Sequence, residues 1–233
     1  MSSNLLNKEV RVGTRQAKDT LFDALASVAK ALGNGRRAEL VDVLAQGERS
    51  VDELAGEIGQ TVANASQHLQ VLLRAGLVRT RRDGPRVFYS LASADVGALW
   101  RAMREVAGAH VSRIDELASA YLGDRSQLAT IGREELLGRM RAGEVMVLDV
   151  RPPAEYAAGH LPDAVNVPPD ELEARLAELP AGQPVVAYCR GPLCAYADTA
   201  VRALTAAGRP ALRLVDGLPE WAAAGLPVTR ATA

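Results

Sequence analysis

The stretch VVAYCRGPLCAYADTAVRAL, residues 185–204, contains both cysteines of a 233-residue chain, Cys189 and Cys194. A run of apolar, β-prone residues precedes Cys189, and a pattern of helical period follows Cys194. A strand, a short loop and a helix in this order are typical of an α/β domain. Backbone N–H groups in such a loop and at the start of the helix favour an anion. We therefore expect a thiolate, a persulfide or a sulfur oxyanion to be stabilised there, and the thiol pKa to be lowered.

The same alternation of strand and helix extends on both sides of this stretch. Short apolar runs at residues 145–150 and 211–217 alternate with helical patterns at residues 133–143, 170–180 and 196–208. This alternation predicts a parallel sheet covered by helices. The chain is therefore expected to be multidomain, with an α/β domain at residues 131–233 and a linker at residues 123–130.

Residues upstream of the linker follow a helical period and predict a helix-rich domain at residues 1–122. Helical patterns cover residues 19–33, 36–47, 50–59 and 61–76, and each ends at a glycine. The two short helices that meet at IGQT, residues 58–61, predict a helix-turn-helix with Thr61 as an N-cap. An Asp-Gly pair between β-prone runs then predicts a β-hairpin over residues 77–91. One helix of more than six turns is expected over residues 94–122, and a helix of this length in a small domain packs on a partner chain.

The second helix of a helix-turn-helix inserts into the major groove of DNA, where short polar side chains reach the base edges. The candidates on its early turns are Thr61, Asn64, Ser66, Gln67 and His68, whereas Val62, Leu69, Leu72 and Leu73 suit the core. Arginines of the hairpin would contact phosphates or an adjacent minor groove, and these are Arg81, Arg82 and Arg86. Two alternatives stay open: His68 could pack rather than bind DNA, and the many arginines could reflect genomic base composition.

The composition, 48% apolar and 24% charged, is that of a folded soluble protein. The N-terminus lacks the apolar core of a signal peptide, and no apolar run approaches the roughly 18 residues needed to span a bilayer. We expect a cytoplasmic protein without a membrane partner, in which thiols are kept reduced and the two cysteines are reactive. No cofactor and no metal are expected, because His110 with Asp115 does not supply three converging ligands.

Residues 31–92 resemble the winged helix-turn-helix of the ArsR/SmtB family of bacterial repressors, and the resemblance extends over roughly residues 18–120. The most specific part is ASQHLQVLLRAGLVRTRRDGPRVFYSL, residues 65–91. The resemblance implies a homodimer, often formed through terminal helices, that releases double-stranded operator DNA when an inducer binds. Two departures matter: residues 50–59 lack the cysteine pair of arsenic and cadmium sensors, and residues 94–116 lack the paired Asp/His ligands of zinc sensors. The usual sensor sites are therefore missing from this domain.

Three stretches, at residues 145–168, 185–200 and 214–228, resemble the signatures of a rhodanese domain in the expected order. The resemblance implies that sulfane sulfur passes from a small donor to a thiol acceptor through a persulfide on Cys189. It assigns Arg190, Gly191, Pro192, Leu193, Cys194 and Ala195 to the active-site loop, with amides of this loop turned toward the outer sulfur. It assigns Asp149, Arg151, Glu155 and His160 to support of the fold and of the pocket rim. Asp163 replaces the usual glycine of the signature, and aspartate tolerates a positive φ.

Phosphatases and arsenate reductases of the same fold use a Cys-x5-Arg loop, but the corresponding positions here are Ala195 and Ala200. Sulfur chemistry is therefore favoured over phosphate chemistry. Cys194 is then either a resolving cysteine, which forms a disulfide or polysulfide bridge with Cys189, or an inert packed thiol.

Together these features predict a dimeric transcriptional repressor whose rhodanese domain senses or transfers sulfane sulfur at Cys189, with the signal reaching the dimer helix through the linker. The alternative is a sulfurtransferase enzyme whose DNA-binding domain is an accessory module. A docking module with a vestigial cysteine is disfavoured by the complete loop. Trivalent arsenic stays open as an inducer, because soft ions bind paired thiolates.

Overall fold

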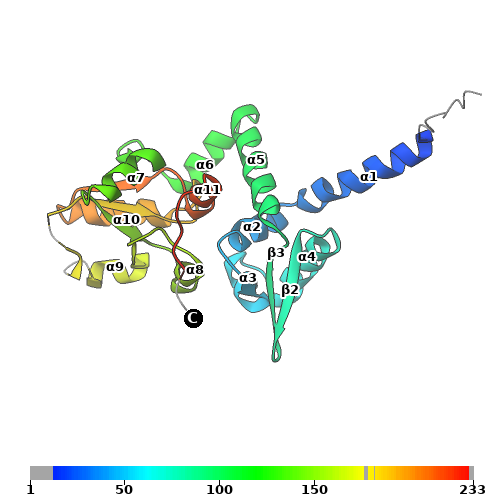
Figure 1. The fold of residues 1–233 in the computed structure, drawn as a ribbon, viewed down its shortest axis with the longest axis horizontal. Helices are drawn as coiled ribbons and strands as arrows, with labels where there is room; N and C mark the ends of the chain where they lie inside the picture. Colours follow the sequence, from blue (N-terminus) through cyan, green and yellow to red (C-terminus); the bar gives the residue numbers. More distant parts are fainter. Residues whose placement is uncertain (1–12, 176–177, 181, 231–233) are drawn as a thin grey trace, which may run out of the picture.

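A computed structural model describes residues 13–175, 178–180 and 182–230 of the chain. Two halves with different architecture are visible, joined by the helices α5 and α6 (Figure 1). The first half contains α1 (Arg15–Leu32), α2 (Gly35–Leu44), β1 (Arg49–Ser50), α3 (Val51–Glu57), α4 (Val62–Arg74), β2 (Val78–Asp83), β3 (Arg86–Leu91), α5 (Ala94–His110) and α6 (Ile114–Leu122). The expected domain limits include residues 1–12 and 231–233, which lie outside the described residues.

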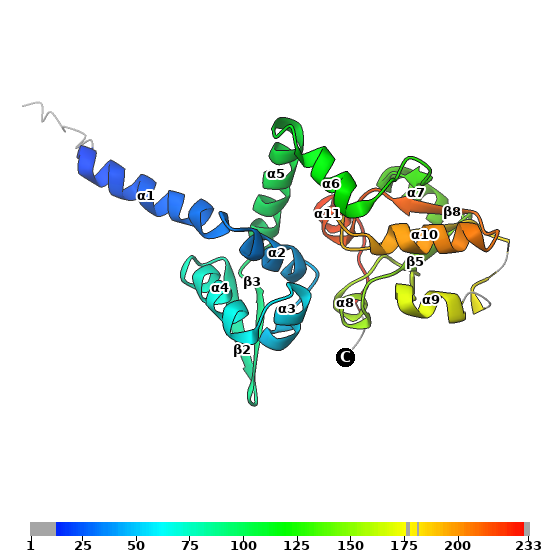
Figure 2. The same ribbon diagram turned by 180° about the vertical axis from the view of Figure 1, so that it is seen from behind.

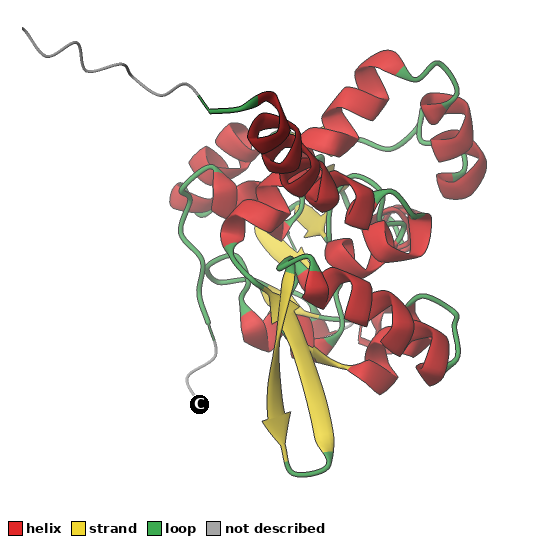
Figure 3. Cartoon of the chain, turned by 90° about the vertical axis from the view of Figure 1, so that its right-hand side faces the viewer, coloured by secondary structure: helices red, strands yellow, loops and turns green. Residues whose placement is uncertain are grey.

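The helix-turn-helix and its hairpin are confirmed, and local hydrogen bonds explain their boundaries. The Thr61 hydroxyl accepts a hydrogen bond from the Asn64 N–H at 3.2 Å and caps α4, as expected. Ser50 and Glu53 form a capping box at the start of α3. Strands β2 and β3 pair from Val78 opposite Leu91 to the turn at Gly84, and the resulting hairpin projects from the domain (Figure 3).

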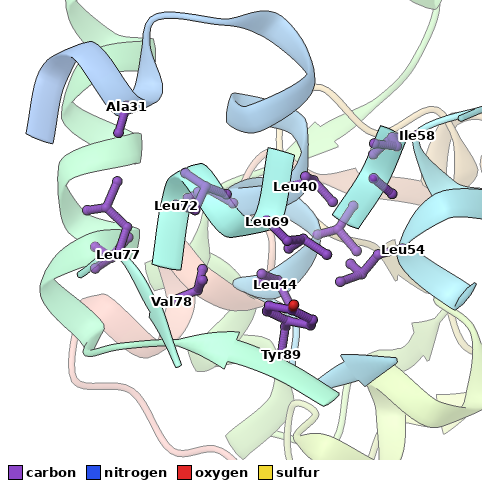
Figure 4. Packing of buried hydrophobic residues seen from close by; sticks show 14 of the residues in the cluster. Ala31, Leu40, Leu44, Leu54, Ile58, Leu69, Leu72, Leu77, Val78 and Tyr89 are labelled. Atoms are coloured by element: carbon purple, nitrogen blue, oxygen red, sulfur yellow. The ribbon is translucent and has the colours of Figure 1, made fainter. Parts of the chain in front are cut away.

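The core of this half lies between α2, α3, α4 and the hairpin (Figure 4). Leu69 and Leu72 of α4 are fully buried and pack in one cluster with Leu40 and Tyr89. Val62, expected in the core, is 44% exposed instead. It is the first residue of α4, where the neighbouring turn covers less of the side chain than the later helical turns do.

The prediction of a single helix over residues 94–122 is wrong, because the chain forms two helices there. The helix α5 ends at His110, and Val111 has an extended backbone, with φ −101° and ψ 100°. No proline marks the break; β-branched Val111 and the following Ser112 have weak helix propensity. The bend directs α6 toward the second half of the chain (Figure 1).

The helix α1 extends away from the rest of the described chain in opposite views (Figures 1 and 2). Its apolar side chains Leu21, Phe22 and Leu25 are 57–62% exposed. Val106 of α5 and Leu117 of α6 are also more than half exposed. A soluble monomer rarely leaves so many large apolar side chains in water, so these helices present a surface suited to a second protein chain.

The second half contains β4 (Thr130–Ile131), α7 (Arg133–Arg141), β5 (Met146–Asp149), α8 (Pro153–Ala158), β6 (Val165–Asn166), α9 (Pro169–Arg175), β7 (Val185–Tyr188), α10 (Tyr196–Ala206), β8 (Ala211–Leu214) and α11 (Leu218–Ala223). Its five strands form a parallel sheet in the order β4-β8-β7-β5-β6, as the alternation of strand and helix predicts. Successive residues of β7 face opposite sides of the sheet. Val185 packs with α9 and α10, and Val186 packs with α7 and α11.

The turn at Asp163 also agrees with the expectation. Asp163 has φ 58° and is the single non-glycine residue with a positive φ in the described ranges. The turn therefore keeps the conformation that a glycine would adopt there.

Candidate functional site

The two cysteines lie at opposite ends of the loop between β7 and α10. Cys189 follows the central strand and is buried, whereas Cys194 is partly exposed, and both are free thiols. Gly217, in the segment after β8, lies directly against the loop backbone. A Cβ atom at position 217 would lie 2.4 Å from the carbonyl group of Arg190 and from the nitrogen of Gly191. Glycine at this position lets two segments support the cysteine loop at close range.

Cys194 carries the lowered pKa in this pair. A hydrogen bond from the Cys189 thiol lowers the pKa of Cys194 to about 7, against the opposing effect of burial. Backbone N–H groups of Tyr196 and Arg190 bind the Cys194 sulfur, and the charge of Arg190 contributes in the same direction. Cys194 is therefore the thiol of the pair that ionises more readily at neutral pH.

Cys189 differs from the expectation for a loop of this kind. Burial raises the pKa of Cys189 well above its ordinary value, and its hydrogen bond to Cys194 raises it further. The N–H groups of Gly191 and Ala197 oppose this change. The expected lowering of a thiol pKa by loop amides thus applies to Cys194, while Cys189 is the proton donor in the pair.

Arg190 links the loop to two carboxylates that belong to different halves of the chain. Its guanidinium contacts Glu155 of α8 at 2.6 Å and Glu57 of α3 at 2.7 Å. Its backbone carbonyl accepts a hydrogen bond from Gln46 Nε2 at 3.1 Å. Since the N–H group of the same residue binds the Cys194 sulfur, Arg190 connects the thiol pair directly to the helix-turn-helix.

Arg125, in the expected linker, holds the other side of the loop. Its guanidinium donates to the carbonyl oxygens of Pro192 at 2.8 Å and Cys194 at 3.2 Å. It also pairs with buried Asp198 of α10 at 2.6 Å, and Asp198 in turn pairs with Arg213 of β8. The linker and the loop therefore share one network of charged hydrogen bonds.

Further polar contacts join the two halves around the loop. Arg49 of β1 pairs with buried Glu155 at 3.2 Å, and Arg104 of α5 pairs with Glu220 of α11. Gln46 accepts a hydrogen bond from buried Arg151 at 3.3 Å. The helix-turn-helix domain and the α/β domain are thus held together by side chains that meet beside the cysteines.

A cavity of about 460 Å³ lies between the halves at this point. The cysteine loop contributes Cys194 to its lining, and α10 contributes Tyr196. The helix-turn-helix half contributes Asp42, Trp100 and Arg104. Its volume falls in the range of about 300–1,000 Å³ that small-molecule sites occupy.

Side chains in the stretch that resembles the rhodanese signature pack at the ends of the strands from which the loop extends. Asp149 and Arg151 form a fully buried ion pair at 2.6 Å, and the hydroxyl of Tyr188 donates to Asp149. His160 stacks on Tyr156 with ring centroids 3.8 Å apart. These groups fix the ends of β5 and β7, from which the loop extends.

The predicted DNA-contacting side chains lie on α4 and on the hairpin. Thr61, Asn64 and Gln67 are exposed at the start of α4, whereas Ser66 and His68 are half-buried. On the hairpin, Arg82 and Arg86 are exposed. Arg81 is exposed too, but it pairs with Glu48 at 2.6 Å and with Asp83 at 3.3 Å and lies over the ring of Phe88. The arrangement places all of these residues in the helix-turn-helix half.

In the described part of the chain, no three His, Cys, Asp or Glu side chains lie close enough together to hold a metal ion. Among the same residues, no helix is both long enough and apolar enough to cross a membrane.

Comparison with known proteins identifies both halves. Residues 34–80 match the family described as bacterial regulatory protein, arsR family, and residues 132–224 match the rhodanese-like domain. HTH-type transcriptional regulator Rv0324 of Mycobacterium tuberculosis is 47% identical over 216 residues, which cover 93% of this chain and 95% of the relative. The chain belongs to the arsR family. This ArsR-family transcriptional regulator carries a DNA-binding winged helix-turn-helix followed by a rhodanese-like domain.

Other relatives match one half of the regulator. A sulfurtransferase of Allochromatium vinosum is 37% identical over 99 residues, 42% of this chain and 92% of the relative. A solution structure of the homodimeric winged helix-turn-helix DNA-binding domain of a possible ArsR-family regulator from Mycobacterium bovis is 42% identical. It covers 44% of this chain and 94% of that chain, with a TM-score of 0.41.

Sequence reasoning missed the residues of the regulator that join its two domains. Gln46, Arg49, Glu57 and Arg104 contact the α/β domain, and none of them was predicted as a site residue. Their partners lie more than 100 residues away in the sequence, and polar residues on short helices are also typical of a solvent-exposed face. A weak signal was present in Arg190, since a charged residue beside a buried cysteine needs a carboxylate partner.

Proposed function

We propose that this regulator is a homodimeric repressor whose affinity for operator DNA is set by sulfane sulfur bound at the Cys189–Cys194 pair. The observation that supports it best is the position of Arg190. Its N–H group binds the Cys194 sulfur, and its guanidinium binds Glu57 at the end of the first helix of the helix-turn-helix. A chemical change at the cysteines therefore has a direct path to the DNA-binding helices.

The proposed reaction uses a small persulfide, R–S–SH, as donor. The outer sulfur is transferred to Cys189, the donor S–S bond breaks, and the donor leaves as the thiol R–SH. Cys194 then attacks Cys189 Sγ, the disulfide forms, and hydrogen sulfide leaves. Two thiols are oxidised and the sulfane sulfur is reduced, so the persulfide itself is the oxidant and no other reactant is needed.

The disulfide removes both the negative charge of Cys194 and the hydrogen bond between the thiols. The N–H groups of Arg190 and Tyr196 then lose their anionic acceptor, and the loop relaxes. Because Arg190 also holds Glu57 and Gln46, we propose that α3 and the adjoining α4 change position relative to DNA. The linker residue Arg125, which binds the carbonyl of Cys194, provides a second connection.

DNA binding in this proposal uses the side chains predicted from the sequence. Asn64 and Gln67 would contact bases in the major groove, with Thr61, Ser66 and His68 beside them, and Arg82 and Arg86 would contact phosphates. Arg81 would join them once DNA phosphate competes with Glu48. The exposed apolar side chains of α1, α5 and α6 would form the dimer contact, and the homodimeric state of the related domain from Mycobacterium bovis supports this.

The test is the affinity for a fragment of the gene's own promoter, measured by fluorescence anisotropy before and after treatment with polysulfide. Treated wild type is expected to bind the fragment about 10-fold more weakly, within the usual range of coupling between two sites. Neither Cys189→Ser nor Cys194→Ser can form the disulfide, so each is expected to bind DNA with the same affinity before and after treatment. If treated wild type binds as tightly as untreated protein, the proposal is wrong.

The coupling between the domains can be tested separately with Glu57→Gln. This change removes the ion pair with Arg190 but leaves Arg190 paired with Glu155. We expect the variant to form the Cys189–Cys194 disulfide normally, whereas the 10-fold loss of DNA affinity shrinks to about twofold or less. Mass spectrometry and anisotropy on the same sample measure the two quantities.

Asp52→Asn is the matched control for Glu57→Gln, because Asp52 is an exposed carboxylate on the same helix. It is expected to respond to polysulfide as wild type does. A full response in Glu57→Gln would show that the Arg190–Glu57 contact does not carry the signal.

The alternative is sulfurtransfer as the main activity, which the 37% identity to a sulfurtransferase favours. In that case reduced protein would turn over thiosulfate or a persulfide with a thiol acceptor many times per Cys189. Cys189 is buried in the α/β core and does not line the cavity between the halves, which argues for a single-turnover sensor instead.

A further inference from the structure

The cavity between the two domains has features that the sulfur switch alone does not require. Cys194 belongs to its lining, whereas buried Cys189 does not. A donor that reaches the loop through this cavity therefore meets Cys194 first. Cys194 is also the thiol whose pKa is lowered to about 7 by the hydrogen bond from Cys189, so it is the better nucleophile at neutral pH.

The helix-turn-helix half contributes α5 and α2 to the lining of the cavity. Arg104 of α5 lies against the loop, because its Nη1 would be 3.5 Å from a Cβ atom built on Gly191. Its Nη2 pairs with Glu220, but its Nε is buried and has no hydrogen-bond partner among the described residues. A buried N–H group of an arginine without an acceptor is costly, and a carboxylate is the acceptor that a guanidinium binds best.

The remaining walls combine aromatic rings with carboxylates. The indole N–H of Trp100 donates a hydrogen bond to Asp42 at 2.6 Å. The guanidinium of Arg104 lies over the Trp100 ring, with its central carbon 5.8 Å from the ring centroid. Tyr196 and Tyr121 also contribute rings, and both are exposed. Such a lining suits an organic group that carries both a carboxylate and an amine, whereas an inorganic polysulfide would leave most of the 460 Å³ unfilled.

We infer that the cavity between the two domains binds a small organic persulfide of the amino-acid type, with its carboxylate on Arg104, and that its sulfur passes first to Cys194. This inference rests on the proposed function and specifies the donor. In the first step the Cys194 thiolate attacks the outer sulfur of R–S–SH, the donor S–S bond breaks, and R–S⁻ takes the persulfide proton and leaves as R–SH. In the second step Cys189 gives its proton to Cys194 and attacks the outer sulfur, so that Cys189 holds the persulfide and Cys194 is a thiol again.

The order of transfer is tested by mass spectrometry of the full chain, quenched with an alkylating agent after brief exposure to cysteine persulfide. Cys189→Ser is expected to gain one sulfur atom on Cys194, because a serine hydroxyl can still donate a hydrogen bond to the Cys194 sulfur. In wild type the rate is expected to rise through a midpoint near pH 7. Cys194→Ser is expected to gain sulfur on Cys189 about 10-fold more slowly than wild type gains it, because the Cys189 thiol is buried and protonated. Equal rates in wild type and Cys194→Ser would overturn the inference.

The donor class is tested with Arg104→Gln and two probes, cysteine persulfide and inorganic hydrogen disulfide. Loss of the guanidinium is expected to slow transfer from cysteine persulfide about 10-fold and to leave transfer from hydrogen disulfide unchanged. Arg101→Gln, on the same helix but outside the lining of this cavity, is the control and should react as wild type with both probes. If Arg104→Gln slows both probes equally, Arg104 supports the fold and does not bind the donor.

These outcomes are separate from the test of the proposed function. Release of DNA by polysulfide without any preference for cysteine persulfide would overturn the inference and leave the proposed switch standing. Selective transfer from cysteine persulfide to Cys194 without release of DNA would overturn the proposed switch and leave the assignment of the donor standing.

Discussion

Gly217→Ala is expected to displace the cysteine loop and to lower the apparent melting temperature of the protein by roughly 6–12 °C, since about 3 kcal/mol of stability is lost. The added Cβ atom would lie 2.4 Å from three backbone atoms of Arg190 and Gly191. Backbone cannot rotate away from a clash as a flexible side chain can, so the whole loop must move. Gly217 has φ −116°, which any residue adopts, and the effect is therefore steric alone.

The same substitution is expected to separate Cys189 from Cys194. Arg190 and Gly191 provide N–H groups to the two sulfur atoms, so displacement of this backbone weakens the amide contacts that hold the thiolate. Cys189 should then react with an alkylating agent at least 10-fold faster than in wild type, because burial no longer protects it. Melting by circular dichroism and alkylation by mass spectrometry measure the two effects.

Gly138→Ala is the matched control for this substitution. Gly138 lies inside α7 of the same domain, and apart from its chain neighbours and the backbone of its own helix no atom lies within 4 Å of a Cβ at this position. Alanine in a helix interior is expected to stabilise the protein by about 0.5–1 kcal/mol relative to glycine. Equal melting temperatures for wild type and Gly217→Ala would show that the loop tolerates the added methyl group and that Gly217 does not position the cysteines.

Much of the fold follows from local patterns in the sequence. The strand at residues 185–188 and the helix after Cys194 are each defined by the period of their apolar residues, and the hairpin is defined by the pair Asp83–Gly84. Caps such as Thr61 act within three residues, so their partners are visible in the sequence. The thiol pair is predictable for the same reason, because its members are five residues apart.

The features that could not be predicted from the sequence depend mainly on contacts between residues far apart in the chain. The pKa order of Cys189 and Cys194 depends on how deeply each thiol is buried, because Cys189 lies in the core of the α/β domain whereas Cys194 lines the cavity between the domains. Glu57 and Arg190 are 133 residues apart, and either one alone is compatible with an exposed side chain. The break after His110 is equally hidden, because the apolar period of the helix continues through it.

Breaking the buried ion pair between Asp149 and Arg151 is expected to cause the largest loss of stability in the α/β domain. Asp149 is fully buried and accepts hydrogen bonds from the Arg151 side chain at 2.6 and 3.0 Å, from the Arg151 backbone at 2.9 Å, and from the hydroxyl of Tyr188. Asp149→Ala would leave the guanidinium of Arg151 buried with Gln46 and the carbonyl of Gly159 as its acceptors. Neither of them neutralises its charge.

Removing one member of a buried ion pair typically costs about 3–5 kcal/mol, because an uncompensated charge stays in a medium of low dielectric constant. We expect Asp149→Ala to reduce the free energy of unfolding by that amount and to shift the urea midpoint accordingly. Glu171→Ala is the control: Glu171 pairs with Arg175 on the surface at 3.1 Å, and its loss should cost less than about 1 kcal/mol. A loss below about 1 kcal/mol for Asp149→Ala would mean that Arg151 finds water on substitution, and that the strand ends below the cysteines do not depend on this pair.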